Sequence, residues 1–232
     1  VATGGYVGVD VFFVISGYLI SSIILRELAQ KRFTFIGFYE RRIRRIFPAL
    51  FVTLAGTTLA AWFILPPEQL QTYAQSLVAT TVFASNIFFW LKSGYFGGDA
   101  ELFPLTHMWS LSVEEQYYIF FPLLAFVAAW GRKWLLDIVM AVSLVVSLWL
   151  CLYYAPQDQM MTFFLTPMRA WELLFGVFIA MHEVRWRAFL VRPRFLGSGL
   201  ELAAAAMILI PVVVYDSQTV FPGWTAIPPV LG

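Results

Sequence analysis

Charged side chains are scarce in this sequence: Asp, Glu, Lys and Arg together make up 12% of its 232 residues. Soluble domains carry about 25% charged residues, so a chain this poor in charge could not cover its surface in water. Hydrophobic residues make up 60% of the chain and aromatic residues 18%, which is typical of proteins embedded in a lipid bilayer. We therefore expect an integral, multi-pass membrane protein.

Cysteine and surplus positive charge are scarce as well. Cys151 is the only cysteine, so the chain cannot form an internal disulfide, and we expect its side chain to be packed or to face lipid. The net charge is +1, and no basic run with interleaved aromatic residues indicates nucleic-acid binding. We expect neither a nucleic-acid partner nor a metal site.

Alternation of apolar and polar residues with a period of two is also missing, which argues against a β-barrel. Continuous apolar runs instead predict an all-α, polytopic transmembrane helix bundle of about seven to eight segments, all within one partial transmembrane domain over 1–232. The candidate spans lie near 6–25, 46–65, 78–91, 117–130, 134–154, 162–181 and 198–215, and an eighth begins near 225.

Basic residues gather in three clusters between these runs, within 26–45, 132–133 and 185–194. The positive-inside rule places all three in the cytoplasm. The stretches 66–77 and 155–161 contain no Lys or Arg, so we expect them to be loops that face outward.

Two cytoplasmic clusters must be separated by an even number of crossings, yet three apolar runs lie between Arg45 and Arg132. Either one run does not cross fully, or the polar stretch 93–116 enters the membrane. Irregular backbone at that depth is tolerated only where protein or a watery cavity surrounds it. We predict that 93–116 is a re-entrant or cavity-lining segment.

The first basic cluster contains Arg41, Arg42, Arg44 and Arg45. On a helix, Arg42 and Arg45 are i,i+3 neighbours and Arg41 and Arg45 are i,i+4 neighbours, so they share a face. Guanidinium groups on one face at the bilayer surface suit the binding of phosphates, such as those of a coenzyme A thioester. The same residues could instead orient the neighbouring spans or contact anionic lipid headgroups.

A second polar block runs from His107 to Tyr118, beside an apolar run. Ionisable groups in lipid surroundings are unfavourable unless they are paired, and they usually have a function. His107, Ser112 and Glu114 are therefore candidate catalytic residues. Ser112 and Glu115 also have the spacing of a capping box, which predicts a helix N-terminus at this point. No nucleophile-elbow pattern surrounds Ser112 or its neighbour Ser110, so neither is a strong candidate nucleophile.

Asp10, Arg169 and Glu172 lie within apolar runs. Arg169 and Glu172 are i,i+3 neighbours that could neutralise each other inside the bilayer. Asp10 is a lone carboxylate, and we expect its partner to be an arginine from another helix. A purely structural ion pair and a substrate contact remain equally consistent with this pattern.

Four blocks of the sequence resemble the acyltransferase 3 family of bacterial membrane enzymes. Gly4–Ile20 is similar to the family segment GGFVGVDVFFVISGYLI, and Arg41–Pro48 matches the signature RRxxRIxP. His107–Tyr118 is similar to the block HxWSLSxEEQFY. Thr166–Gly176 is similar to a RAWELLLG block found in members with a fused extracytoplasmic SGNH-type domain.

The resemblance implies transfer of an acyl group, most simply acetyl, from a cytoplasmic acyl-CoA to a hydroxyl of an exported carbohydrate. Lipopolysaccharide O-antigen and peptidoglycan are the implied acceptors, and the bacterial inner membrane with its lipids is the implied location. Acyl-CoA would be a co-substrate, with no bound cofactor. The implied donor contacts are Arg42 and Arg45 with Arg41 beside them, while Ser16 and Trp109 are implied polar positions within the membrane.

In the family, a span that carries an arginine and the histidine thought to be catalytic precedes the segment that Gly4–Ile20 matches. We therefore expect this chain to be a fragment, truncated at both ends and inactive by itself. A different interpretation is a transporter or flippase for a glycan or a lipid-linked intermediate, because polar intramembrane groups and broken spans also mark transport pathways.

Overall fold

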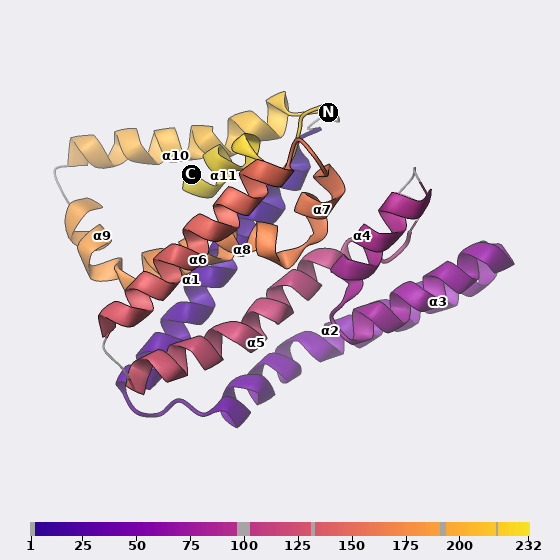
Figure 1. Ribbon diagram of the computed structural model, residues 1–232, viewed down its shortest axis with the longest axis horizontal. Helices are drawn as coiled ribbons and strands as arrows, with labels where there is room; N and C mark the ends of the chain where they lie inside the picture. Colours follow the sequence, from indigo (N-terminus) through magenta and orange to yellow (C-terminus); the bar gives the residue numbers. More distant parts are fainter. Residues whose placement is uncertain (1–2, 97–102, 131–132, 191–193, 217) are drawn as a thin grey trace.

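The computed structural model describes the chain except for residues 1–2, 97–102, 131–132, 191–193 and 217. The described residues form helices and connecting turns, without a strand, so the all-α prediction is confirmed. Figure 1 shows the arrangement. The longer helices are α1 (Gly8–Ala29), α2 (Phe35–Ile64), α3 (Pro67–Thr81), α4 (Ser85–Phe96), α5 (Met108–Trp130), α6 (Lys133–Tyr154), α8 (Thr166–Met181) and α10 (Arg194–Val214). The shorter ones are η1 (Gly5–Val7), α7 (Gln159–Phe164), α9 (Glu183–Leu190), η3 (Trp224–Ala226) and α11 (Ile227–Leu231).

Among the described helices, four stretches are long and apolar enough to cross a membrane, fewer than the seven to eight predicted: Gly5–Ala29, Phe35–Ile64, Trp134–Tyr154 and Gln159–Met181. Gly199–Val214 is apolar but shorter, and α11, the expected eighth span, has 5 residues. The run at 117–130 is the second half of α5, whose first half carries Glu114 and Glu115.

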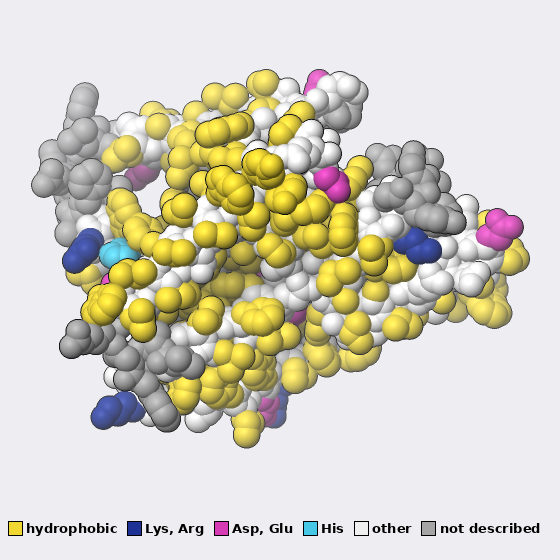
Figure 2. Space-filling view, viewed as in Figure 1, with side chains coloured by type: hydrophobic (Ala, Val, Ile, Leu, Met, Phe, Trp, Pro, Cys, Tyr) yellow, Lys and Arg dark blue, Asp and Glu magenta, His cyan; other side chains and the backbone are white. Residues whose placement is uncertain are grey.

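Apolar side chains cover most of the face seen in Figure 2. On α2 alone, Val52 is 74% exposed and Phe63 is 79% exposed. Charged residues lie buried at the same time, Asp10 and Arg169 among them. Since apolar residues outside and ionic groups inside fit lipid and not water, the protein is an integral membrane protein.

Helices α1 and α8 approach each other most closely at two glycines. A Cβ atom on Gly17 of α1 would collide with the carbonyl oxygen of Leu173, and one on Gly176 of α8 would collide with that of Val14. Small residues let helix backbones come this close in membranes. The contact fixes α8, and with it Arg169, against α1.

Helices α3 and α4 form a hairpin that enters the bundle and turns back. Helix α3 runs antiparallel to α2, where Tyr73 and Thr58 share a hydrogen bond of 2.7 Å. The turn at 82–84 has Phe83 at φ 53°, with its ring centroid 6.2 Å from that of Phe47 on α2. Phe47 lies 17 residues before the end of α2 at Ile64, so the turn lies about 26 Å below that end.

The α3–α4 hairpin explains how three apolar runs can lie between two basic clusters on the same side of the membrane. The run at 78–91 does not cross, because it is broken into α3 and α4, and the stretch predicted as an outward loop at 66–77 is mostly α3. The described part of 93–116 forms the end of α4 and the start of α5, and residues of α5 do line cavities, as described below. The described residues of 93–116 therefore line cavities, as predicted, while residues 97–102 lie outside the described part of the chain. The turn inside the bundle that the crossing count requires lies at 82–84.

The helix ends that adjoin the basic clusters lie on one side of the bundle. The end of α1, the start of α2, the end of α5, the start of α6 and the junction of α8 with α9 all lie towards the left of Figure 1. The ends of α6 and α10 lie away from that side, near the middle of the view and close to the N-terminus. The described helix ends that adjoin the three clusters therefore share one membrane face, as the positive-inside rule requires.

Candidate active site

Glu114 lies at the centre of a buried polar cluster between α1, α2 and α5. Its carboxylate accepts hydrogen bonds from the hydroxyls of Ser16 and Tyr118, and it is 6% exposed. Glu114 and Tyr118 are i,i+4 neighbours, so α5 presents both on the same face. Ser16 faces them from α1. Its hydrogen bond to Glu114 therefore joins two of the blocks that resemble the family, Gly4–Ile20 and His107–Tyr118.

Arg42 of α2 completes this cluster. Its Nη2 atom lies 4.0 Å from Glu114 Oε1, and its guanidinium carbon lies 3.8 Å from the centroid of the Tyr118 ring. The Nε atom of Arg42 is buried and has no hydrogen-bond partner within the described residues. The Glu114 carboxylate and the face of the Tyr118 ring thus hold the Arg42 guanidinium. The Nε–H group of Arg42 remains without an acceptor among the described residues.

A cavity of about 380 Å³ opens beside the cluster, and Ser16, Glu114, Tyr118, Arg42 and Arg45 all line it. Along α2 it extends from Arg42 to Thr53, a rise of about 16 Å. Its remaining walls are apolar side chains of α1 and of the start of α5. The cavity is therefore a slot with two arginines at its basic end; we call it the α2 cavity.

The arginines of α2 differ in their surroundings although they lie within two turns. Arg41 pairs with Glu27 of α1 at 2.8 Å, and Arg44 pairs with Glu40 at 2.7 Å. Neither Arg41 nor Arg44 lines the α2 cavity, whereas Arg42 and Arg45 both do. The predicted donor contacts are thereby divided: Arg42 and Arg45 lie together at the cavity, while Arg41 lies elsewhere.

Ser112 lies away from this cavity. Its hydroxyl shares a hydrogen bond of 2.7 Å with Ser85 and accepts one from the Ser85 amide at 3.2 Å, so it joins α5 to α4. The capping-box prediction is wrong, since α5 already begins at Met108 and Ser112 lies inside it. Ser110 donates to the His107 carbonyl at 3.2 Å, as an ordinary turn residue does.

A second buried cluster joins α1 to α8. Arg169 donates to Asp10 at 2.6 Å, to Glu172 at 2.8 Å and to the Phe163 carbonyl at 3.1 Å. All three charged side chains are completely buried. Both sequence expectations are confirmed: Arg169 and Glu172 form an i,i+3 pair, and the partner of Asp10 is an arginine from another helix.

Aromatic rings surround this ion cluster. The guanidinium carbon of Arg169 lies 5.1 to 5.4 Å from the ring centroids of Trp109, Phe163 and Phe221. Trp109 and Phe163 are themselves in contact, with ring centroids 4.7 Å apart. The predicted intramembrane residue Trp109 therefore packs over Arg169 and separates it from the space outside.

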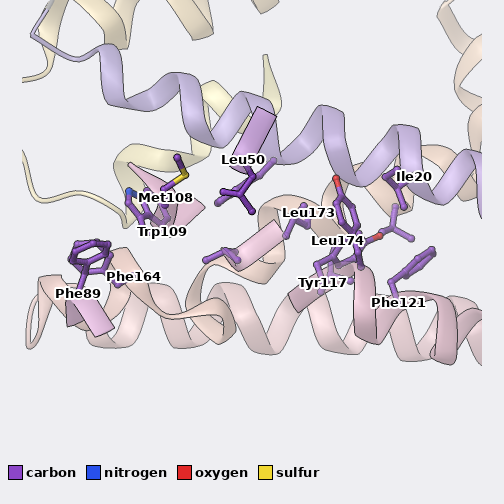
Figure 3. Packing of buried hydrophobic residues seen from close by; sticks show 14 of the residues in the cluster. Ile20, Leu50, Phe89, Met108, Trp109, Tyr117, Phe121, Phe164, Leu173 and Leu174 are labelled. Carbon is purple, nitrogen blue, oxygen red and sulfur yellow. The ribbon is translucent and has the colours of Figure 1, made fainter. Parts of the chain in front are cut away.

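His107 does not reach the α2 cavity. It is exposed and lines a second cavity, of about 720 Å³, together with Trp109 and the loop that follows α10. Figure 3 shows Met108 and Trp109 side by side at one end of the buried core. Met108 lines the α2 cavity and Trp109 the second one, so the first turn of α5 borders both.

Sequence reasoning missed two parts of these sites. Tyr118 was not among the candidates, although its position four residues after Glu114 was a signal that both lie on one helix face. Asp216 follows α10 and lines the second cavity. No local pattern marks it, because a long stretch of chain separates it from its neighbours in space.

Comparison with known proteins agrees with the geometry. The family model described as acyltransferase domain matches residues 1–231. Peptidoglycan O-acetyltransferase OatA of Listeria monocytogenes is 34% identical over 215 residues, which cover 90% of this chain and 34% of that protein. Putative peptidoglycan O-acetyltransferase YrhL of Bacillus subtilis is 34% identical over 187 residues, which cover 78% of this chain and 29% of that protein.

A putative O-acetyltransferase of Staphylococcus aureus is 34% identical over 185 residues, which cover 77% of this chain and 30% of that protein. The chain thus spans about a third of the length of these relatives. No solved structure matches it. The match over nearly all of the chain, with Arg42, Glu114 and Ser16 brought together at one cavity, shows that the chain belongs to the acyltransferase 3 family.

Proposed function

We propose that this chain is the transmembrane part of an O-acyltransferase that moves an acyl group from a cytoplasmic acyl-CoA to a hydroxyl of a cell-surface carbohydrate. The observation that carries the proposal is the α2 cavity, which brings Arg42 and Arg45 to the cluster around Glu114. Acetyl is the favoured acyl group and peptidoglycan the favoured acceptor, because the relatives above carry those names.

The donor end of the proposal rests on the two arginines at the cavity. Guanidinium groups bind phosphate oxygens with paired, charge-assisted hydrogen bonds, and the unpartnered Nε of Arg42 is available for one. A cavity of about 380 Å³ is at the small end of ligand sites. It would hold the thioester arm, while the nucleotide phosphates stay at Arg42 and Arg45 near the basic face.

The cluster around Glu114 positions Arg42 in this proposal. The carboxylate and the Tyr118 ring hold the guanidinium at the cavity, so its side chain is ordered before the donor arrives. The acceptor hydroxyl needs a general base, a role for which a histidine is suited near neutral pH. His107 remains a candidate for that role from its exposed position at the second cavity.

The test uses the full-length protein in lipid nanodiscs and measures its affinity for acetyl-CoA. Arg42→Ala and Arg45→Ala are each expected to weaken binding by about tenfold or more, since a hydrogen bond to a charged group contributes about 1.5–3 kcal/mol. Arg44→Ala is the matched control, because Arg44 pairs with Glu40 outside the cavity. Unchanged affinity in both cavity variants would refute the donor site.

A transporter for a glycan or a lipid-linked intermediate is the alternative, and the α3–α4 hairpin favours it, because broken helices at membrane depth are common in transporters. Deletion of the gene separates the two functions. Loss of glycan acylation with export intact supports the acyltransferase. Loss of export with acylation intact supports the transporter.

A further inference from the structure

The second cavity lies at the end of the bundle opposite the basic clusters. It is built from η1, the start of α5, α7 and the loop after α10, and its volume is about 720 Å³. In Figure 1, α7 and the end of α10 lie near the middle of the view, close to the N-terminus and away from the helix ends at the left that adjoin the basic clusters. By the positive-inside rule this is the outer side; we call it the outer cavity.

Aromatic side chains form the inner wall of the outer cavity. The ring centroids of Tyr6 and Phe221 lie 4.6 Å apart, and those of Trp109 and Phe163 lie 4.7 Å apart. Phe163, Trp109 and Phe221 also cover Arg169, as described above. The wall is therefore a set of aromatic rings, three of which pack against the buried Arg169 guanidinium.

Polar groups form the rim. Asp216 accepts hydrogen bonds from Thr219 and from the Gln218 amide, each 3.0 Å long, and these bonds hold the pKa of its carboxyl below the usual range. Asp216 is therefore ionised at neutral pH and still exposed. His107 stands on the rim as well. None of the described residues that line the cavity is a Lys or an Arg.

Hydrogen bonds tie the segments of the cavity together. Gln159 of α7 donates to the Phe221 carbonyl at 3.0 Å, and Tyr6 donates to the Asp216 carbonyl at 3.3 Å. Thr3 donates to the Tyr215 carbonyl at 2.6 Å. The rim and the aromatic wall are thus fixed relative to each other, which lowers the entropy lost on binding a ligand.

This combination fits a neutral, hydroxylated ring. A pyranose presents C–H groups on its faces, which pack against aromatic rings, and hydroxyls at its edge, which donate to a carboxylate. An anion such as a phosphate would meet Asp216 without a compensating Lys or Arg. A purely apolar ligand would donate no hydrogen bond to the ionised Asp216 carboxylate on the rim.

We propose that the outer cavity binds the acceptor glycan through a neutral pyranose unit, with aromatic contacts to Tyr6 and Trp109 and hydroxyl hydrogen bonds to Asp216. This inference rests on the proposed acyltransferase function and adds the acceptor site. The adjacent residues Met108 and Trp109 border the α2 cavity and the outer cavity respectively. Donor and acceptor would therefore meet across the first turn of α5.

The experiment measures binding of a soluble probe, a tetramer of β-1,4-linked N-acetylglucosamine, to the full-length protein in nanodiscs by calorimetry. Asp216→Asn, which keeps the size of the side chain, is expected to weaken binding about tenfold, because it removes a charged acceptor. Tyr6→Leu, which removes the ring, is expected to weaken binding about fivefold. Tyr6→Phe keeps the ring and loses only the hydroxyl that donates to the Asp216 carbonyl, so it should bind more tightly than Tyr6→Leu.

Glu68→Gln is the matched control, because Glu68 is an exposed carboxylate in the first turn of α3 and does not line the cavity. Acetyl-CoA affinity is measured in every variant and should stay unchanged, which shows that each is folded. If the probe does not bind, or binds Asp216→Asn and Tyr6→Leu as tightly as the unchanged protein, the acceptor site is refuted. Loss of acetyl-CoA affinity only in Arg42→Ala and Arg45→Ala would leave the proposed function standing in that case.

Discussion

Among single residues, Tyr118 contacts the candidate donor site in two different ways. Its hydroxyl donates to Glu114, and its ring lies under the Arg42 guanidinium. The two contacts can be separated by substitution, because phenylalanine keeps the ring and removes the hydroxyl. The residue therefore allows the hydrogen bond and the cation–ring contact to be measured one at a time.

Tyr118→Phe is expected to lower the free energy of unfolding by about 1–3 kcal/mol, because the buried Glu114 carboxylate loses a donor. Thermal unfolding in detergent measures the change. Tyr153→Phe on the exposed face of α6 is the control and should have no effect. A stability of Tyr118→Phe equal to that of the control would contradict the hydrogen bond.

Arg169 is the residue whose loss should be most harmful. Arg169→Met leaves Asp10 and Glu172 buried together without their cation, and breaking a buried ion pair in this way costs about 3–5 kcal/mol. We expect a strong fall in the yield of folded protein. The triple variant Asp10→Asn/Arg169→Met/Glu172→Gln should recover part of that yield, since no buried charge remains. Equal yields for the single and triple variants would argue against this account.

Some of these side-chain contacts could be predicted from the sequence, and others could not. The pairing of Asp10 with an arginine was predictable, because a lone carboxylate in lipid surroundings needs a cation and Arg169 is one of few cations outside the basic clusters. The cluster around Glu114 was not, because Ser16 lies on another helix and its register against α5 is set by packing. Spacing identifies neighbours along one helix, but it does not identify neighbours across two.

Among the secondary-structure elements, the packing of α1 against α8 depends on Gly17 and Gly176. Gly176→Val is expected to lower the free energy of unfolding by about 3 kcal/mol or more, because the new side chain would collide with the Val14 carbonyl. Gly56→Ala is the control, since a Cβ atom there meets open space. Thermal unfolding of the two variants provides the comparison, and similar midpoints would show that α1 and α8 are not in contact at this point.

The α3–α4 hairpin could be predicted only in part, because counting apolar runs indicates that one run does not cross the membrane but does not locate the break. The three apolar runs between Arg45 and Arg132 predict an incomplete crossing, and the described residues place a break at 82–84, between α3 and α4. Val82 and Phe83 are apolar, so the run reads as continuous. The turn is formed by the positive φ of Phe83 and by Gln116 of α5, which donates to the Phe83 carbonyl at 2.9 Å. Both causes are invisible in the local pattern.

The topology of the whole molecule can be tested by labelling of single cysteines in a Cys151→Ser background. A membrane-impermeant maleimide should label Glu68→Cys and Lys92→Cys in intact cells, because the hairpin returns α4 to the outer side. Lys31→Cys, beside the first basic cluster, should be labelled only after permeabilisation. Labelling of Lys92→Cys only after permeabilisation would mean that 78–91 crosses the membrane after all.

The first turn of α5, where Met108 lines the α2 cavity and Trp109 lines the outer cavity, has a consequence for the cell in which the protein resides. If the α2 cavity and the outer cavity open to opposite compartments, the side chains of Met108 and Trp109 also seal the membrane against protons and ions. Trp109→Ala should then lower the membrane potential of cells that express the full-length protein, as a voltage-sensitive dye would show. The requirement for an electrically tight barrier would limit how wide a path for the acyl group can become.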